Sequence, residues 1–268
     1  MPLARADLET LLRSRQLDRT LTTALPPPEP DPEYACGPTG VPALDARLGG
    51  GFPRGQLSEI IGTRSSGRSS LLLSMLAAAT ARGELVAVVD ALDMLDVASL
   101  EAAAVVLERL LWIRGHVVAN PGLCRDTNQR AVEQAIRALA LILQAGNFGL
   151  VAFDAGEAPA GALTRLPFTT WLRLQRMLEG TPTVCVLIGP EPMARSSAGL
   201  TLQLGQAGRA GQAGQAGQAG QAGQAGQAGN PITFSDRLFK GLSTEARVVR
   251  ARAREFDDVR VCLSTAAC

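Results

Sequence analysis

The sequence has almost no lysine or histidine and few aromatic residues. Lys240 is the only lysine beside 25 arginines, and His116 is the only histidine. A zinc site is therefore not expected, and His116 is predicted to be a surface or hydrogen-bonded residue rather than a catalytic base. The ten aromatic residues leave little surface for stacking on nucleic-acid bases. The formal net charge of +1 creates no overall field for nucleic acid, so any DNA contact must come from a local patch.

Disulfide and targeting signals are also missing. The five cysteines form no C-x-x-C pair, and their number is odd (Cys36, Cys124, Cys185, Cys262 and Cys268). Reduced thiols in a cytosol are the simplest interpretation. The first residues, Met1 to Arg5, do not resemble a signal peptide, and no apolar run reaches the length of a membrane span. The sequence therefore predicts a soluble cytoplasmic protein without membrane contact.

Two stretches of biased composition divide the chain. Residues 26–32 contain five prolines in seven positions, which predicts a stiff spacer between an N-terminal segment, 1–33, and a core domain, 34–268. From 205 to 229 the triplet Gly-Gln-Ala repeats, once as Gly-Arg-Ala, without proline. Because no side chain there is both apolar and larger than alanine, we expect a flexible insert in the core, between strands at 200–204 and 232–234.

The N-terminal segment is predicted to contain an amphipathic helix over residues 6–23. Leu8 and Leu12 belong to its apolar set, and three arginines lie between the apolar positions. A short helix behind a stiff spacer cannot bury its apolar face on itself. It would dock on its own core, dock on another protein, or stay disordered. Leu8 and Leu12 are therefore candidate partner contacts.

Strand and helix patterns alternate through the core. Strands are predicted at 57–61, 84–90, 110–114, 149–154 and 183–188, and helices at about 68–82, 98–109, 126–144 and 168–178. A short helix, a glycine hinge and a turn are expected within 38–55. This order predicts an α/β fold with a mostly parallel, doubly wound sheet, helices on both faces and ligands at the carboxyl ends of the strands. A pair of strands at about 246–253 and 259–263 is expected to close the sheet as a C-terminal β-hairpin.

A glycine-bounded loop follows the first of these strands. Residues 62–69 read Gly-Thr-Arg-Ser-Ser-Gly-Arg-Ser, which matches the phosphate-loop pattern G-x-x-x-x-G-K-[ST] except that Arg68 replaces the lysine. In such a loop, backbone N–H groups and the helix N-terminus face a phosphate, and the serine at the Ser69 position holds Mg²⁺. The candidate binding residues are Gly62, Thr63, Arg64, Ser65, Ser66, Gly67, Arg68, Ser69 and Ser70.

Arg68 indicates that the loop has lost its chemistry. Lysine delivers a compact charge, whereas a guanidinium is a broad planar fork. In a loop shaped for an ammonium group, Arg68 would bind phosphate from outside or fold away. A general drift from lysine to arginine marks this sequence, but drift would not usually be tolerated at a hydrolytic lysine. We therefore expect an inherited loop that requires no cofactor, with ATP and Mg²⁺ bound at most weakly.

Two aspartates are candidates for the rest of a nucleotide site. Asp154 ends the strand at 149–154, where a Walker-B acid would hold Mg²⁺ through water, and its alternative role is to cap a turn. Ser69 and Asp154 would thus be the metal ligands if nucleotide binds. Hydrolysis also needs a base just after the strand that ends at Asp90. Asp93 is the one candidate there, although its side chain is shorter than that of glutamate.

Arg250, Arg252 and Arg254 alternate with alanines near the C-terminus. In a strand, this spacing places three guanidinium groups on one face. One interpretation is a solvated outer face. The other is a patch for DNA phosphates or for an acidic partner.

These stretches together resemble the RecA family. The stretch from Thr39 to Gly55 and the strand and loop at 58–70 resemble the approach to a RecA nucleotide site and the site itself. The sequences at 88–91 and 151–154 resemble its next two landmarks. The resemblance spans about 38–263, is strongest over 38–90, and implies a RecA-like P-loop NTPase core.

Three departures from RecA argue against a recombinase. Leu92 stands where RecA carries its catalytic glutamate, and the stretch that matches its glutamine switch reads Gly189-Pro190. The segment that matches the second DNA-binding loop, 190–199, is short, has no aromatic residue and carries only Arg195 as a basic residue. The protein is therefore expected to be no enzyme, with weak or indirect DNA contact.

A RecA-like body with such a nucleotide site is similar to the ImuA family of translesion-synthesis accessory proteins. That resemblance implies a non-hydrolytic role in damage-induced (SOS) mutagenesis and DNA repair, in the cytoplasm at the nucleoid. The implied partners are RecA, whose filaments it would cap or interrupt, the Y-family polymerase homologue ImuB, and an error-prone DNA polymerase III alpha subunit. Two alternatives remain open: a weak DNA-stimulated ATPase that uses Arg68, Ser69, Asp93 and Asp154, and a cell-division inhibitor similar to SulA.

Overall fold

The computed structural model describes residues 35–115, 125–156, 158, 163, 166–194, 197–206, 242–251 and 260–265. Apart from Ala35, these residues lie in the compact unit Cys36–Cys268. The predicted helix at 6–23 with Leu8 and Leu12, the proline-rich spacer, the Gly-Gln-Ala insert and the predicted strand at 232–234 lie outside the described residues. So do His116, Arg195, Arg252 and Arg254.

The alternation of strands and helices is confirmed. In chain order the elements are β1 (Cys36–Gly37), α2 (Pro42–Leu48), β2 (Phe52–Pro53), β3 (Leu57–Gly62), α3 (Arg68–Ala81), β4 (Val86–Asp90), α4 (Val97–Ala102), the 3₁₀ helix η1 (Leu107–Arg109), β5 (Leu110–Arg114), α5 (Arg125–Ala145), β6 (Leu150–Asp154), α7 (Phe168–Leu178), β7 (Val184–Gly189), β8 (Leu200–Gln206), β9 (Leu242–Ala251) and β10 (Arg260–Thr265).

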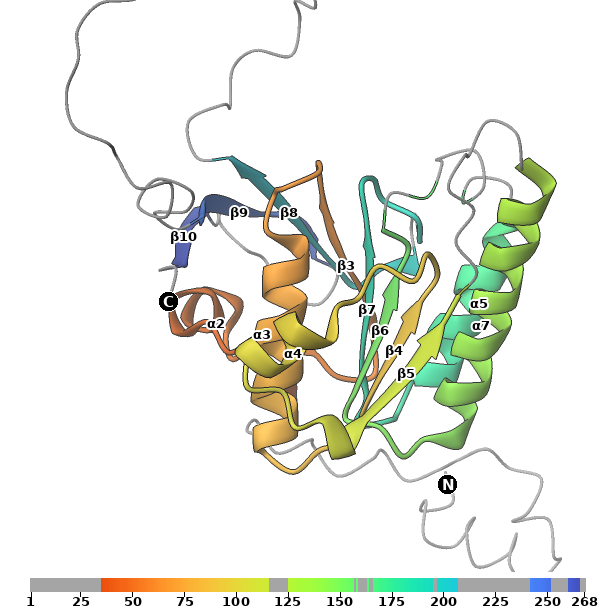
Figure 1. The fold of residues 1–268 in the computed structure, drawn as a ribbon, viewed down its shortest axis with the longest axis horizontal. Helices are drawn as coiled ribbons and strands as arrows, with labels where there is room; N and C mark the ends of the chain where they lie inside the picture. Colours follow the sequence, from red (N-terminus) through yellow and green to blue (C-terminus); the bar gives the residue numbers. More distant parts are fainter. Residues whose placement is uncertain are drawn as a thin grey trace, which may run out of the picture. The chain divides into compact units, whose positions relative to one another are not determined.

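The main sheet has eight strands in the order β10-β9-β8-β3-β7-β6-β4-β5. The six strands from β8 to β5 are mutually parallel, whereas β9 runs antiparallel to β8 and β10 antiparallel to β9. The predicted fold class, a mostly parallel α/β sheet with a C-terminal hairpin, is therefore confirmed (Figure 1). The core strands β3, β4 and β7 are buried along their whole length, as expected for parallel strands with both faces covered.

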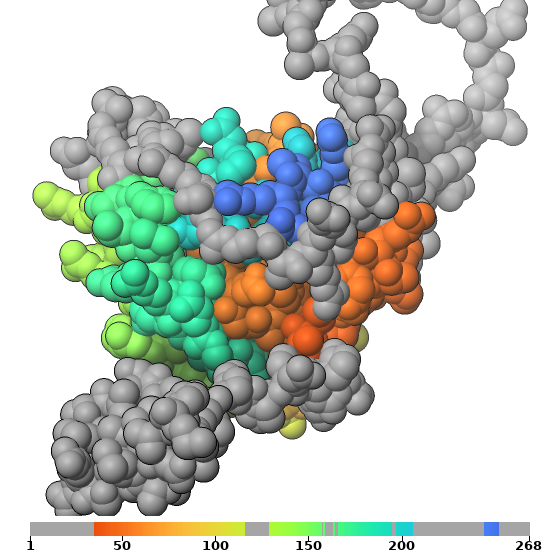
Figure 2. All heavy atoms as spheres, turned by 180° about the vertical axis from the view of Figure 1, so that it is seen from behind, coloured from red at the N-terminus to blue at the C-terminus, as the bar shows by residue number. Residues whose placement is uncertain are grey.

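Helices cover the two faces of the sheet with two separate apolar clusters. On one face α2, α3 and α4 pack against side chains such as Ile60 and Val88, and on the other α5 and α7 pack against Leu57 and Phe153. Figure 2, seen from behind, shows the side chains of α5 and α7 in green on one side and residues from the beginning of the unit in orange toward the other side, with side chains of β9 in blue at the surface above them. The carboxyl edge of the parallel strands is left for the loops that follow them.

One predicted helix, 98–109, is wrong in its length. The helix α4 ends at Ala102, and a separate 3₁₀ helix covers the last residues of the prediction. The chain reverses at Ala104, whose φ is 60°, and the N–H of Val105 donates to the carbonyl oxygen of Leu100 at 3.0 Å. This is a left-handed helix end that brings the side chains of Val105 and Leu100 into the same apolar cluster. No glycine marks it, because burial of Val105 offsets the strain at an alanine.

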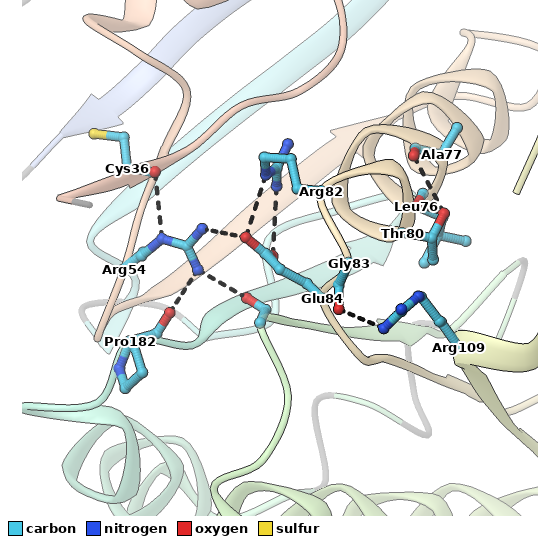
Figure 3. Close-up of polar contacts among 11 residues, drawn as sticks. Cys36, Arg54, Leu76, Ala77, Thr80, Arg82, Gly83, Glu84, Arg109 and Pro182 are labelled. Carbon is cyan, nitrogen blue, oxygen red and sulfur yellow. Dashed lines mark hydrogen bonds and ion pairs between the residues drawn. The ribbon is translucent and has the colours of Figure 1, made fainter. Parts of the chain in front are cut away.

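An arginine joins the amino ends of the central strands, opposite the edge where ligands are expected. The Nε of Arg54 donates to the carbonyl oxygen of Cys36 at 3.3 Å, and its Nη1 donates to those of Gly149 at 3.3 Å and Pro182 at 2.6 Å. Its Nη2 lies 2.8 Å from Oε1 of Glu84 (Figure 3). One side chain thereby links the segments that precede β3, β4, β6 and β7.

Candidate functional site

The predicted phosphate loop connects β3 to α3, at the carboxyl edge of the sheet. β3 ends at Gly62 and α3 begins at Arg68, so the strand, loop and helix follow in the predicted order. Two residues within the loop have positive φ, Ser65 at 60° and Gly67 at 95°. They turn the chain so that the N-terminus of the 14-residue helix α3 faces the loop. This N-terminus contributes the partial positive charge that favours an anion.

Gly62 lies where two segments of backbone pass close together. A Cβ atom at this position would lie 2.5 Å from the carbonyl oxygen of Leu204 and 2.5 Å from Oγ of Ser66. Leu204 is also the residue of β8 that pairs with Gly62 in the sheet. The first glycine of the pattern is therefore required by the contact between the loop and β8.

We expect Gly62→Ala to lower the free energy of unfolding by about 2 kcal/mol, because the new methyl group would push β8 and the loop apart. Gly205→Ala is the matched control on the neighbouring strand, since a Cβ atom there meets nothing within 4 Å. That variant should stay within about 0.5 kcal/mol of the natural protein. Urea denaturation of the two variants measures the difference, and equal stabilities would contradict the close contact at Gly62.

Arg68 is folded inward. Only 8% of this residue is exposed, and its Nη1 donates to the carbonyl oxygen of Gly156 at 3.3 Å. Gly156 belongs to the turn that follows β6, so the side chain crosses from the start of α3 to the end of β6. The sequence left two possibilities for this guanidinium, binding a phosphate from outside the loop or folding away. The structure has the folded orientation. A compact ammonium group would lack the planar fork of this guanidinium.

Asp154 lies at the predicted strand end and takes part in the same turn. It is the last residue of β6, and its Oδ1 accepts the N–H of Gly156 at 2.7 Å. This contact is the turn-capping role that the sequence left open, and a metal-binding role stays a prediction. Asp154 thus accepts the backbone N–H of Gly156, and Arg68 donates to the carbonyl oxygen of the same residue. The exposed Ser69, the other predicted metal ligand, is in the first turn of α3.

Asp93 holds the loop after β4 in an ion pair. Its Oδ1 lies 2.7 Å from Nε of Arg114 and its Oδ2 accepts the N–H of Nη2 at 2.8 Å. This hydrogen bond, aided by the charge of Asp93, raises the pKa of Arg114, whose guanidinium also lies 4.8 Å from the centre of the Trp112 ring. Both carboxylate oxygens are therefore engaged. The role of Asp93 as a base stays a prediction. The neighbouring Leu92 supplies no polar group, and its Cδ1 packs beside Gly156, 3.2 Å from where a Cβ atom at Gly156 would lie.

Two residues close to the loop were not among the predicted site residues. Glu59 is fully buried in β3, where its Oε1 accepts the N–H groups of Met193 and Ala194 at 2.7 Å each and its Oε2 accepts the hydroxyl of Thr201 at 3.0 Å. A glutamate inside an apolar strand run is a signal that could have identified it, because a buried carboxylate needs donors. Thr244 of β9 contacts the loop itself, and no local sequence pattern marks it.

The described residues give no sign of a metal cluster or a reactive thiol. Among them, no group of three or more His, Cys, Asp or Glu side chains is placed to hold a metal ion. Cys36 and Cys185 are buried free thiols, and burial raises the pKa of Cys185 to about 12, so this thiol stays protonated at neutral pH. None of the helices in the described ranges has the length and apolar character needed to cross a membrane.

Comparison with known proteins finds a similarity over the part of the chain that contains most of this site. Residues 29–157 match the RecA N-terminal domain. This stretch is RecA-like. It contains β3, the phosphate loop, α3 and Asp154, so it includes most of the candidate site. Arg250, in β9 and exposed, and Thr244 lie outside it.

Three RecA proteins illustrate the extent of the similarity. Protein RecA of Lactobacillus acidophilus is 29% identical over 163 residues, which cover 59% of this chain and 44% of the relative. Protein RecA of Thermus thermophilus is 31% identical over 179 residues, with 61% and 48% covered. That of Leifsonia xyli is 31% identical over 166 residues, with 56% and 43% covered. The chain thus spans somewhat less than half of each of these curated relatives.

Proposed function

We propose that this protein is a non-hydrolytic, RecA-related accessory protein of DNA repair, in damage-induced mutagenesis and translesion synthesis. The observation that carries this proposal is the buried Arg68 side chain, bonded to the turn after β6, in a loop that otherwise keeps the strand, glycines and helix of a phosphate site. The strand and helix that would flank a nucleotide site are present, and an arginine stands where the pattern has the lysine that would act in hydrolysis. Such a protein would act through its surface.

The residues present fit a phosphate better than they fit hydrolysis. The N-terminus of α3 and the loop backbone suit a phosphate group, and Ser69 with Asp154 would hold Mg²⁺. A bound Mg²⁺ ion would neutralise part of the negative charge on the phosphates of the nucleotide. Leu92 contributes no base, and Asp93 is engaged by Arg114 at 2.7 Å. We therefore expect weak nucleotide binding without turnover.

Phosphate release in the presence of single-stranded DNA tests the absence of hydrolysis. We expect release at the level of a buffer blank for the natural protein and for Asp154→Ala. Arg68→Lys should bind ATP about tenfold more tightly, because a compact ammonium group replaces the folded guanidinium, and still give no turnover. DNA-stimulated release that disappears in Asp154→Ala would instead support the weak recombinase-like ATPase.

The proposed partners are RecA, ImuB and an error-prone DNA polymerase III alpha subunit. A RecA-like body presents a surface related to that of a RecA subunit, so it would cap or interrupt a filament of RecA on DNA. The test uses purified components: immobilised RecA–DNA filaments and immobilised ImuB, each with the full chain. We expect binding to both and shorter filaments. Binding to neither would reject this part of the proposal, whatever the outcome of the hydrolysis assay.

A further inference from the structure

A threonine from the C-terminal hairpin reaches the middle of the phosphate loop. Thr244 of β9 is 5% exposed, and its hydroxyl oxygen lies 2.6 Å from the carbonyl oxygen of Ser66 and 2.7 Å from that of Gly205. A hydroxyl has one proton, so the two carbonyl groups share a single donor. This contact joins segments 178 positions apart in the sequence. It also lies outside the RecA-like stretch, 29–157.

The bond to Ser66 fixes the orientation of a peptide group that a phosphate would meet. The peptide unit between Ser66 and Gly67 is planar and trans, since the chain has no cis peptide among the described residues. Its C=O and N–H groups therefore point in opposite directions. With the carbonyl of Ser66 held toward β9, the N–H of Gly67 points to the opposite side. A phosphate loop needs its backbone N–H groups turned toward the phosphate.

The Thr244 hydroxyl is the donor to the Ser66–Gly67 peptide itself, while backbone hydrogen bonds hold the peptide units on either side. The N–H of Ser66 donates to the carbonyl oxygen of Thr63 at 3.1 Å, and the N–H of Leu71 donates to that of Gly67 at 2.9 Å. Gly67 has a φ of 95°, and glycine has no Cβ to prevent rotation of the neighbouring peptide unit. Ser66 is 1% exposed, so its carbonyl cannot rely on bulk water. If the Thr244 hydroxyl were removed, a buried carbonyl would lose its donor and the peptide unit would gain freedom to turn.

We propose that Thr244 is a positioning residue that holds the Ser66–Gly67 peptide in the orientation that accepts a phosphate. The inference rests on the proposed retention of the loop as a phosphate site. It adds that the hairpin formed by the last strands completes this site from outside the RecA-like stretch. Thr244 does not touch the phosphate itself; it acts through the backbone of the loop.

Three variants of the full chain test this role. Thr244→Val removes the hydroxyl at nearly constant volume, and Thr244→Ser retains it. Thr183→Val is the matched control, because the buried Thr183 hydroxyl also donates to a backbone carbonyl, that of Phe148 at 2.7 Å, at the opposite end of the sheet. Amide hydrogen exchange over residues 62–70 is measured in the protein without nucleotide, followed by titration with Mg²⁺-ATP.

Thr244→Val should exchange about tenfold faster over 62–70, whereas Thr183→Val should match the natural protein there and Thr244→Ser should stay close to it. Where the natural protein binds Mg²⁺-ATP, Thr244→Val should bind it about tenfold more weakly than Thr183→Val. Equal exchange over 62–70 in the two valine variants would overturn the proposal. Because exchange is read without ligand, it decides the role of Thr244 even when no ATP binding is detected. Phosphate release by the natural protein would contradict the proposed function and leave this result unaffected.

Discussion

Glu59→Ala is expected to lower the free energy of unfolding by about 4 kcal/mol. The fully buried carboxylate accepts three hydrogen bonds, from the N–H groups of Met193 and Ala194 and from the hydroxyl of Thr201. Alanine would leave these three donors without an acceptor and would open a cavity beneath the turn that follows β7. Each buried donor left without an acceptor costs about 1–3 kcal/mol, so this site should dominate single-residue effects in the core.

Glu59→Gln separates the acceptor geometry from the charge. The side-chain oxygen of glutamine can still accept the two N–H groups, and its amide nitrogen can donate to the hydroxyl of Thr201. We expect a loss of only about 1 kcal/mol for this variant. Urea denaturation of both variants gives the comparison. Equal destabilisation by alanine and glutamine would show that the negative charge, and not the acceptor geometry, holds the turn.

Arg54→Ala is the second variant with a large expected effect, about 3 kcal/mol in the free energy of unfolding. Its side chain is 10% exposed and serves three carbonyl groups, those of Cys36, Gly149 and Pro182, as well as Glu84 (Figure 3). Loss of the guanidinium would remove its contacts with all four partners at the amino ends of several strands, although the carbonyl oxygen of Gly149 would keep the N–H of Val184 at 2.9 Å. The expected observation is a lower midpoint of urea denaturation with little change in the denaturant dependence.

Arg82→Ala is the matched control for Arg54→Ala. Arg82 also binds Glu84, with Nε 3.2 Å from Oε1, but its side chain is 34% exposed and this carboxylate lies near the surface. A surface ion pair contributes about 0.5 kcal/mol, so this variant should be nearly as stable as the natural protein. A loss for Arg82→Ala as large as that for Arg54→Ala would show that the charge on Glu84, and not the carbonyl groups, accounts for the effect.

Patterns that repeat along the chain predicted the fold well. The continuous apolar strands, the alternating helices and the loop at 62–69 all depend on local composition, and the structure has the helix 168–178 at its predicted limits. The position of Asp154 at a strand end followed from the apolar run before it. These features can be predicted from short windows of sequence, because the spacing of apolar residues within such a window indicates a buried strand or an amphipathic helix.

Features that depend on contacts between distant residues were not predictable in this way. The end of α4 at Ala102 depends on burial of Val105, and the orientation of Arg68 depends on the carbonyl of Gly156 beyond the end of another strand. The bond from Thr244 to the loop depends on how β9 pairs with β8. In each case the local sequence allows several conformations and a partner far along the chain selects one.

The order of strands in the sheet has a consequence for synthesis of the chain on the ribosome. The strand that leads into the phosphate loop, β3, pairs with β7 and β8 and with neither β4 nor β6. Both of its neighbours are translated only after β4, β5 and β6, which already pair among themselves. The nascent chain can thus form one edge of the sheet first, while β3 has no strand to pair with. β3 then pairs with strands far along the chain, and such non-local pairing is slow. The nucleotide-type loop is consequently among the last parts of the described fold to reach its final structure.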